Sequence, residues 1–275
     1  MIEIYYELPI WLLAVIVILL SLVVGLGASL GLRRAFRLRP SDDEVETAVS
    51  LMQVVAAYIG ILIAFAAVQV WQDFAEAGNA VHREAASAAQ LYRDLATYGP
   101  ETVEARADLR RYVTSVVTDE WPLLAKGEGS AATEHALFGL FDSVGGLRPK
   151  DGRDSAIYSE VFANLNELVE LRRDRLIHSK SGMPMILWIV GLVGSILIVA
   201  YTATFPQTLT NRLMIAGISV ALGLVFLFIL IVDQPFAGAY QVEKDELAEL
   251  PAKFDLLDRL SAQAAASNPL ENSRN

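Results

Sequence analysis

The sequence predicts an all-α polytopic membrane protein with four transmembrane helices and a helical-bundle domain inserted between the second and third. Hydrophobic residues make up 54% of the 275 positions and gather in blocks. Each block reaches the roughly 20 apolar residues that a helix needs to cross the hydrocarbon core of a bilayer. Between the second and third blocks, apolar residues recur at helical spacing instead. These observations indicate spans joined to a helical domain outside the bilayer.

The four spans follow from long uncharged stretches. No charged side chain interrupts the first two blocks, and Arg212 is the only charge between Met183 and Val232. Arg212 therefore divides that stretch into two spans. We place the spans at residues 8–32, 47–71, 184–205 and 212–232.

The first span is interpreted as a retained helix rather than as a cleaved signal peptide. Glu3 and Glu7 precede the apolar run, whereas four arginines follow it. A signal peptide has the opposite order, with its positive charges before the apolar segment.

The arginines beyond the first span also predict the orientation. They lie in a short loop, and short cytoplasmic loops carry the excess of Lys and Arg. The N-terminus, the inserted domain and the C-terminus are then extracytoplasmic at the cell (inner) membrane. A second basic cluster before the third span favours the opposite orientation, but long segments cross membranes largely regardless of charge. The first cluster is Arg33, Arg34, Arg37 and Arg39, and the second is Arg172, Arg173, Arg175 and Lys180.

The second helix is predicted to extend beyond the membrane at both ends. Ser41 and Glu44 form a capping-box pattern before the span, and no Gly-Pro break appears until Gly99. The inserted domain occupies residues 72–182, where three further helices are expected. They run from Glu101 to Trp121 with Pro122 ending the helix, from Thr133 to Val144, and from an N-cap at Asp154 or Ser155.

A C-terminal tail comprises residues 233–275. Its segment 247–260 is weakly amphipathic and is interrupted by Pro251. From Gln263 onward the tail is rich in Ala, Ser and Asn, and we predict that it is disordered.

The composition excludes several functional classes. The 22 basic and 32 acidic residues give a net charge of −10, which argues against nucleic acid as a partner and against a polybasic patch on anionic lipid. There is no cysteine, so disulfides, thiolate catalysis and Cys-ligated zinc are excluded.

No enzyme signature stands out in the sequence. The three histidines lie on different segments, and none has a Glu three residues before it, as di-iron bundles require. Asp119 and Glu120 are adjacent on a helix, where neighbouring positions do not face one another, and we interpret them as part of a solvated face. We therefore expect no catalytic residue, no metal site and no cofactor.

The second span carries one helical face of small or polar residues. Small residues allow helices to approach closely, so this face is either a packing seam or the narrow lining of a pore. No span has an ionisable residue at its centre, which disfavours coupled transport but is compatible with a passive channel. Asp233 ends the fourth span and either rings a pore mouth or lies at the interface. The candidate pore or packing residues are Gln53, Ala57, Gly60, Ala64 and Ala67.

Short sequence fragments, in this order and with two spans on each side of the domain, resemble the bestrophin-like family of bacterial membrane proteins, also described as DUF4239. The resemblance covers about Leu8 to Gly238. The fragments are Glu84-Ala85, Leu91-Tyr92-Arg93, Glu120-Trp121-Pro122, Asn166 with Arg172 to Leu176, Pro184 with Leu187-Trp188, and Asp233-Gln234-Pro235-Phe236-x-Gly238.

The resemblance implies a function as well as a fold. Bestrophins have four spans per subunit and form pentameric anion channels, so it implies a homo-oligomer in the lipid bilayer that conducts anions. Glu84, Arg93, Trp121 and Asp233 match the family pattern, with no role attached to them. The chain departs from bestrophins because no acidic calcium clasp is evident, and because their large domain is cytosolic, against the orientation predicted above.

Two functions are therefore carried forward. The first is an oligomeric, bestrophin-like ion (anion) channel. The alternative is a non-conducting membrane sensor or assembly module whose helical domain binds a protein partner.

Overall fold

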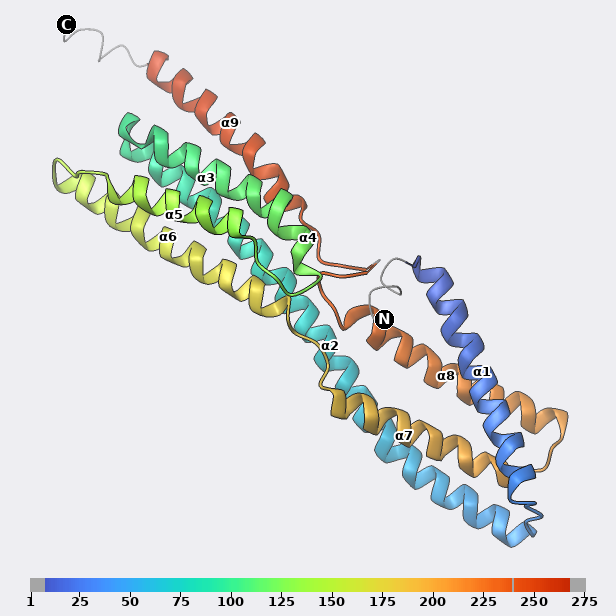
Figure 1. Cartoon of the computed structure of the whole chain (residues 1–275). Coiled ribbons are helices and arrows are strands. Elements are labelled where there is room, and N and C mark those ends of the chain that lie inside the picture. Colours follow the sequence, from blue (N-terminus) through green and yellow to red (C-terminus); the bar gives the residue numbers. More distant parts are fainter. Residues whose placement is uncertain (1–7, 239, 268–275) are drawn as a thin grey trace, which may run out of the picture. The chain divides into compact units, whose positions relative to one another are not determined.

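The computed structural model describes residues 8–238 and 240–267, and every regular element within them is helical (Figure 1). Short 3-10 helices at Pro100–Thr102 and Thr202–Thr204 and a π-helix at Val116–Glu120 supplement the α-helices. The α-helices are α1 (Ile10–Ala35), α2 (Asp42–Tyr98), α3 (Val103–Ser115), α4 (Trp121–Leu124), α5 (Ala131–Gly145), α6 (Gly152–His178), α7 (Met185–Tyr201), α8 (Leu209–Val232) and α9 (Asp245–Ser267).

Four helical segments are long and apolar enough to cross a membrane, which confirms the predicted fold class. They are Ile10–Ala35, Asp42–Tyr98, Met185–Thr204 and Leu209–Val232. The chain divides into two compact units. A membrane unit contains the described residues up to Phe74 together with Ser181–Gln241, and a helical unit contains Ala75–Lys180 together with the described residues from Val242 onward.

Helix α2 contributes to both units because nothing interrupts it for 57 residues. Its start is the predicted capping box: the Ser41 backbone N–H donates to Glu44 Oε2 at 2.7 Å, and the Glu44 N–H donates to Ser41 Oγ at 3.4 Å. Its end comes before Gly99, whose φ of 139° is a conformation that other residues rarely adopt.

In the membrane unit, α1 packs closely along α8 (Figure 1). Glycine on each helix faces serine on the other: Gly25 lies against Ser219, and Gly223 lies against Ser21. Small residues at a membrane helix interface let the two backbones approach closely. The apolar side of α2 packs separately against residues of α7 and α8 in a core that includes Ile63, Ala66, Val70, Met183, Ile229 and Val232.

In the helical unit, the second half of α2 packs with α3, α5, α6 and α9 around a second core. Val81, Leu91 and Leu95 of α2 are fully buried, as are Leu109 of α3 and Leu165 of α6. Val81, Leu91 and Leu95 lie on the same side of α2, so this helix has one apolar face that needs partners.

Two predicted helix boundaries are wrong. Pro122 does not end a helix. The chain makes a π-turn at Val116–Glu120, and Pro122 then occupies the first turn of α4, where its missing N–H costs no helical hydrogen bond. The N-cap of α6 is Asp151, whose carboxylate accepts from the Asp154 N–H at 2.8 Å.

The C-terminal segment forms a longer helix than predicted. Helix α9 runs through Pro251 and continues to Ser267, past the Gln263 at which the sequence predicts disorder. Its alanine-rich end has the highest intrinsic helix propensity, which composition-based disorder arguments overlook. The rest of the predicted disordered tail, residues 268–275, lies outside the described residues.

Helix α9 is attached to the helical unit by one stacked ring pair and a set of ion pairs. Phe254 stacks on Tyr92 with ring centroids 4.0 Å apart and an interplanar angle of 3°. Asp258 receives hydrogen bonds from the Tyr92 hydroxyl and from Arg106 Nη1, both at 2.6 Å. Arg110 Nη1 donates to Asp255 Oδ1 at 2.7 Å.

Candidate functional site

The small residues of the second span lie on an exposed face of α2. Gln53, Ala57, Gly60 and Ala64 are exposed, whereas Ala67 is half-buried beside the membrane core. A Cβ atom added at Gly60 would meet nothing within 4 Å among the described residues. The centre of this face is therefore not used for packing inside the described chain.

The circumference of α2 divides into three stripes of different character. The buried stripe holds Ile63, Ala66 and Val70. A second stripe carries large exposed hydrophobic side chains, which suit contact with lipid, and the small face lies between the two. The large residues are Leu51, Val54, Tyr58, Ile61, Phe65 and Val68. Packing inside the described part of the chain therefore does not account for the centre of the small face.

The end of the fourth span is held by a carboxylate. Asp233 Oδ1 accepts the backbone N–H of Met183 at 2.5 Å, which joins the end of α8 to the residues before α7. Phe236 and Ala237 are buried, and Gly238 turns the chain with a φ of 88°. Burial raises the pKa of the Asp233 carboxyl, although the Met183 N–H opposes this effect. Asp233 thus combines a structural hydrogen bond with a partly desolvated charge.

We expect an Asp233→Asn variant to be at least as stable as the wild type at neutral pH. The amide oxygen still accepts the Met183 N–H, while the desolvated charge is removed. Because folding raises the pKa of Asp233, this carboxyl favours folding below its unfolded pKa of about 3.9 and loses that contribution as the pH rises through the folded value. The melting temperatures of variant and wild type should converge near pH 4 and separate near pH 7. A less stable variant at pH 7 would show that the negative charge itself is needed.

The other family-pattern residues lie in the helical unit. Glu84 is fully buried and Trp121 nearly so, at 8% exposure. Arg93 is exposed and donates from Nη2 to Gln90 Oε1 at 2.6 Å. Two of these three positions therefore belong to the interior of the domain.

Glu84 is part of a buried ion network that sequence reasoning missed. Arg175 of α6 donates from Nε to Glu84 Oε2 at 2.5 Å and from Nη2 to Glu84 Oε1 at 3.1 Å. The Tyr112 hydroxyl of α3 donates to the same Oε1 at 2.7 Å. Arg175, Glu84 and Tyr112 are each 0% exposed. A two-pronged arginine–carboxylate pair of this geometry is among the strongest polar contacts in proteins.

Glu120 extends the network to a second arginine. Arg172 donates two hydrogen bonds to Glu120, from Nε to Oε2 at 3.1 Å and from Nη2 to Oε1 at 3.0 Å. Arg175 Nη2 also donates to Glu120 Oε2 at 3.4 Å. Glu120 is 0% exposed, so its assignment to a solvated face is wrong. It ends the π-turn, a widened helical turn that is frequent at functional sites.

Arg175 and Tyr112 both keep their protons at neutral pH. Burial alone would lower the pKa of the Arg175 guanidinium, but the Glu84 carboxylate outweighs this effect and raises it. Burial raises the pKa of the Tyr112 hydroxyl well above its ordinary value, and the negative Glu84 raises it further. Tyr112 therefore remains a hydrogen-bond donor. The network ties α2, α3, α6 and the π-turn together.

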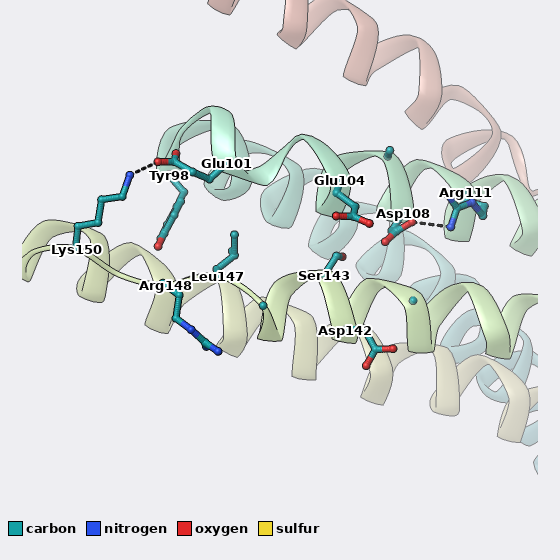
Figure 2. A pocket seen from close by; sticks show the side chains of 13 residues that line it. Tyr98, Glu101, Glu104, Asp108, Arg111, Asp142, Ser143, Leu147, Arg148 and Lys150 are labelled. Carbon is teal, nitrogen blue, oxygen red and sulfur yellow. Dashed lines mark hydrogen bonds and ion pairs between the residues drawn. The ribbon is translucent and has the colours of Figure 1, made fainter.

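A polar hollow of about 750 Å³ lies between the α3 region and α5 (Figure 2). Its carboxylates and cations largely neutralise one another: Arg111 Nη1 pairs with Asp108 at 2.6 Å, and Lys150 pairs with Glu101. Among the described residues, no group of three or more His, Cys, Asp or Glu side chains is arranged to hold a metal ion. The mixed charges of this hollow do not favour one class of ligand.

The fold is similar to that of solved bacterial membrane proteins. Crystal structures of a bacterial bestrophin homologue from Klebsiella pneumoniae align with a TM-score of 0.67 at 16% identity. One of them covers 89% of this chain and 97% of the homologue, and a variant of that protein covers 89% and 98%. At this identity the likeness concerns the fold alone. A sequence search of curated proteins finds no significant match.

A family model describes the sequence itself. The Bestrophin-like domain matches residues 17–247, which include all of α7 and α8, most of α1, and the entire helical unit up to the first turn of α9. This match includes the buried residues Glu84 and Trp121 and also Asp233, which accepts the Met183 N–H. The chain therefore belongs to the bestrophin-like family of membrane proteins.

Proposed function

We propose that this protein assembles into an oligomer that conducts ions, and that the small face of α2 lines or borders the pore. The observation that carries the proposal is the exposure of Gln53, Ala57, Gly60 and Ala64 beside a stripe of large, lipid-compatible side chains. A lipid-facing helix does not need a separate small and polar stripe, whereas a narrow pathway shared between subunits does.

Membership of the bestrophin-like family supports the same function, and we propose anions as the permeating class. No ionisable side chain lies at the centre of the membrane-spanning parts of α1, α2, α7 and α8, so ion-coupled transport lacks its usual intramembrane charge. Selection among ions would then depend on polar groups and on the narrowness of the pore rather than on a charged binding site.

The test is a recording of purified protein in planar bilayers, comparing the wild type with Gly60→Leu. We expect discrete currents in the wild type, with a reversal potential under a KCl gradient that identifies chloride as the carrier. Because Gly60 has open space around it in the chain, leucine should fit without disturbing the fold of one subunit. If the face lines the pore, the current should fall at least about tenfold, as expected for a hydrophobic constriction that gates by dewetting.

Gly27→Leu is the matched control. Gly27 lies in the apolar helix α1, is exposed, and also has nothing within 4 Å of an added Cβ, so the change in helix propensity and hydrophobicity is the same. It should leave the currents unchanged. If Gly60→Leu instead dissociates the oligomer, the face is a subunit seam. Silence of folded wild-type protein across salts, pH and calcium would favour the non-conducting module that binds a protein partner.

A further inference from the structure

Five arginines gather around one hollow at the end of the membrane unit where α1 ends and α8 begins. The hollow has a volume of about 620 Å³ and is lined by the end of α1, the start of α8 and residues of the α1–α2 and α7–α8 connections beside them. Both connections join membrane spans, so the hollow lies at a membrane–water interface. The arginines are Arg33, Arg34, Arg37, Arg39 and Arg212, accompanied by Leu30, Leu38 and Gln207.

The positive charge of this hollow is not neutralised by the described part of the chain. None of the ion pairs formed by described residues involves any of the five arginines. Arg33 uses Nη1 to donate to the Phe205 carbonyl, which fixes the α7–α8 connection against the end of α1. The carboxylate of Glu44, close in sequence, is bound by Ser41.

Arg37 occupies a backbone position that favours glycine. The end of α1 is a Schellman turn, in which the Leu38 N–H donates to the Arg33 carbonyl at 3.0 Å and the Arg37 N–H to the Arg34 carbonyl at 3.3 Å. Arg37 is the left-handed residue of this turn, with a φ of 50°. It is the only non-glycine residue with positive φ in the described part of the chain. An arginine is unfavourable at such a position, because its side chain strains a left-handed backbone that glycine adopts freely.

Arg212 is also placed against local preference. It lies in the first turn of α8, where the helix macrodipole disfavours a cation and attracts an anion. Thr208 caps this helix by accepting the Asn211 N–H at 3.2 Å, so the connection is ordered. Two locally unfavourable arginines that converge on one hollow, with three more around them, are accounted for by an anion that binds there.

We propose that this hollow binds the phosphate headgroup of an anionic phospholipid. Guanidinium groups bind phosphate oxygens in pairs, and basic pockets between membrane helices are suited to acidic headgroups. Leu30 and Leu38 line the same hollow, so its wall offers apolar surface for the glycerol and first methylenes beside the charges. The negative net charge of the whole chain argues against a polybasic lipid site, but the local arrangement reverses that expectation.

Native mass spectrometry of the purified full-length protein tests the proposal. The protein is titrated with phosphatidylglycerol and, separately, with phosphatidylcholine of the same acyl chains. We expect phosphatidylglycerol to be retained at least about tenfold better, because each arginine near the headgroup contributes a further electrostatic attraction. Equal retention of the two lipids would overturn the proposal without any need for a variant.

Arg37→Gly is the sharpest variant, because glycine suits the left-handed turn and the end of α1 is preserved while one charge is lost. Phosphatidylglycerol binding should weaken roughly fivefold, the factor expected for one arginine at a membrane surface. Arg34→Gln combined with Arg212→Gln should weaken it further, whereas Arg259→Gln, an exposed change of equal charge in α9, should have no effect. Unchanged binding in Arg37→Gly and in the double variant would refute the site.

A final titration separates a lipid headgroup from free phosphate. Millimolar inorganic phosphate is added to the complex with phosphatidylglycerol. Retention of the lipid supports the assignment, since apolar contacts add to the headgroup contacts. Displacement of the lipid by inorganic phosphate, or phosphate binding that Arg37→Gly weakens equally, would show that the hollow serves free phosphate instead.

Discussion

Replacing Arg175 by methionine is expected to destabilise the helical unit by about 3–5 kcal/mol, the range measured when one partner of a buried ion pair is removed. Glu84 has no solvent exposure, and the substitution takes away both of its guanidinium hydrogen bonds. Only the Tyr112 hydroxyl still donates to that carboxylate. An uncompensated charge in the core is among the most costly changes that a domain can undergo.

The measurement is hydrogen–deuterium exchange of α6 peptides in the full-length protein. A loss of 3 kcal/mol corresponds to roughly 150-fold faster exchange wherever exchange proceeds by opening of the domain. Arg173→Met is the matched control, since Arg173 lies on the same helix but is exposed, and it should leave exchange within about twofold of the wild type.

A double-mutant cycle distinguishes coupling from simple loss of packing. In Glu84→Gln with Arg175→Met, no charge remains unpaired at position 84 and the glutamine oxygen can still accept from Tyr112. The double variant should therefore be less destabilised than the sum of the two single variants, by about 1 kcal/mol or more. Additive effects would mean that the two residues act independently, and the network described above would then carry no cooperative energy.

The helices of this fold are predictable from sequence because their signals are local. Uncharged blocks mark the spans, and the Ser41–Glu44 capping box marks the start of α2. The ends of the helices are harder to predict from the sequence. The π-turn before Pro122 ends at Glu120, whose carboxylate accepts a hydrogen bond from Arg172, more than fifty residues further along the chain.

The buried arginines of α6 have a signal in the sequence. On α6 the apolar row that includes Val161, Leu165 and Leu168 continues at helical spacing to Arg172 and Arg175, and all five residues are buried. Charged residues in an apolar register indicate either an interrupted face or a buried network. The register of α6 alone does not distinguish these two cases, because the carboxylates that pair with its arginines lie on other helices.

The same reasoning explains Glu84 and Glu120. Glu84 falls in the buried row of α2 between Val81 and Ala88, and Glu120 follows Val116 by one helical turn. Three helices that each place a charge in a core register must bring opposite charges together, since a buried unpaired charge is not tolerated. Charges of opposite sign in the core registers of different helices therefore indicate a buried network, and the fold decides which of them pair.

Other features depend on contacts between segments far apart in sequence. The attachment of α9 joins Tyr92 to Asp258, which are separated by 166 positions, and no local pattern announces it. For the small face of α2 the sequence identifies which residues share the face. No described residue lies within 4 Å of a Cβ added at Gly60, and periodicity does not encode what covers such a face.

Replacing Gly25 by leucine is the second change for which we expect a large effect, because it separates α1 from α8. A Cβ atom at Gly25 would lie 1.8 Å from Ser219 Oγ and 2.7 Å from Ser219 Cβ. The Oγ atom can rotate away, at the expense of its 2.8 Å hydrogen bond to the Ile215 carbonyl, but the Cβ atom is fixed by the backbone. Even alanine must therefore push the helices apart, at about 1–3 kcal/mol for overpacking, and leucine at more.

The expected result for Gly25→Leu is loss of monodisperse protein in size-exclusion chromatography and a melting temperature below that of Gly27→Leu. Gly27 lies two residues along the same helix but has open space around it, so the comparison isolates the α1–α8 contact from hydrophobicity and helix propensity. Because helix association in a bilayer relies on close packing rather than on exclusion of water, the loss of this contact has no hydrophobic compensation.

An exchange of the two residues tests the geometric explanation directly. Gly25→Ala alone should lower the melting temperature, and adding Ser219→Gly should restore most of it, since the methyl group then occupies the space that the serine side chain leaves. The Gly223–Ser21 contact, where an added Cβ would lie 2.2 Å from Ser21 Oγ, keeps its wild-type residues in both variants. If Ser219→Gly fails to rescue Gly25→Ala, the destabilisation arises elsewhere than at this contact, and the close approach of α1 and α8 is not what Gly25 provides.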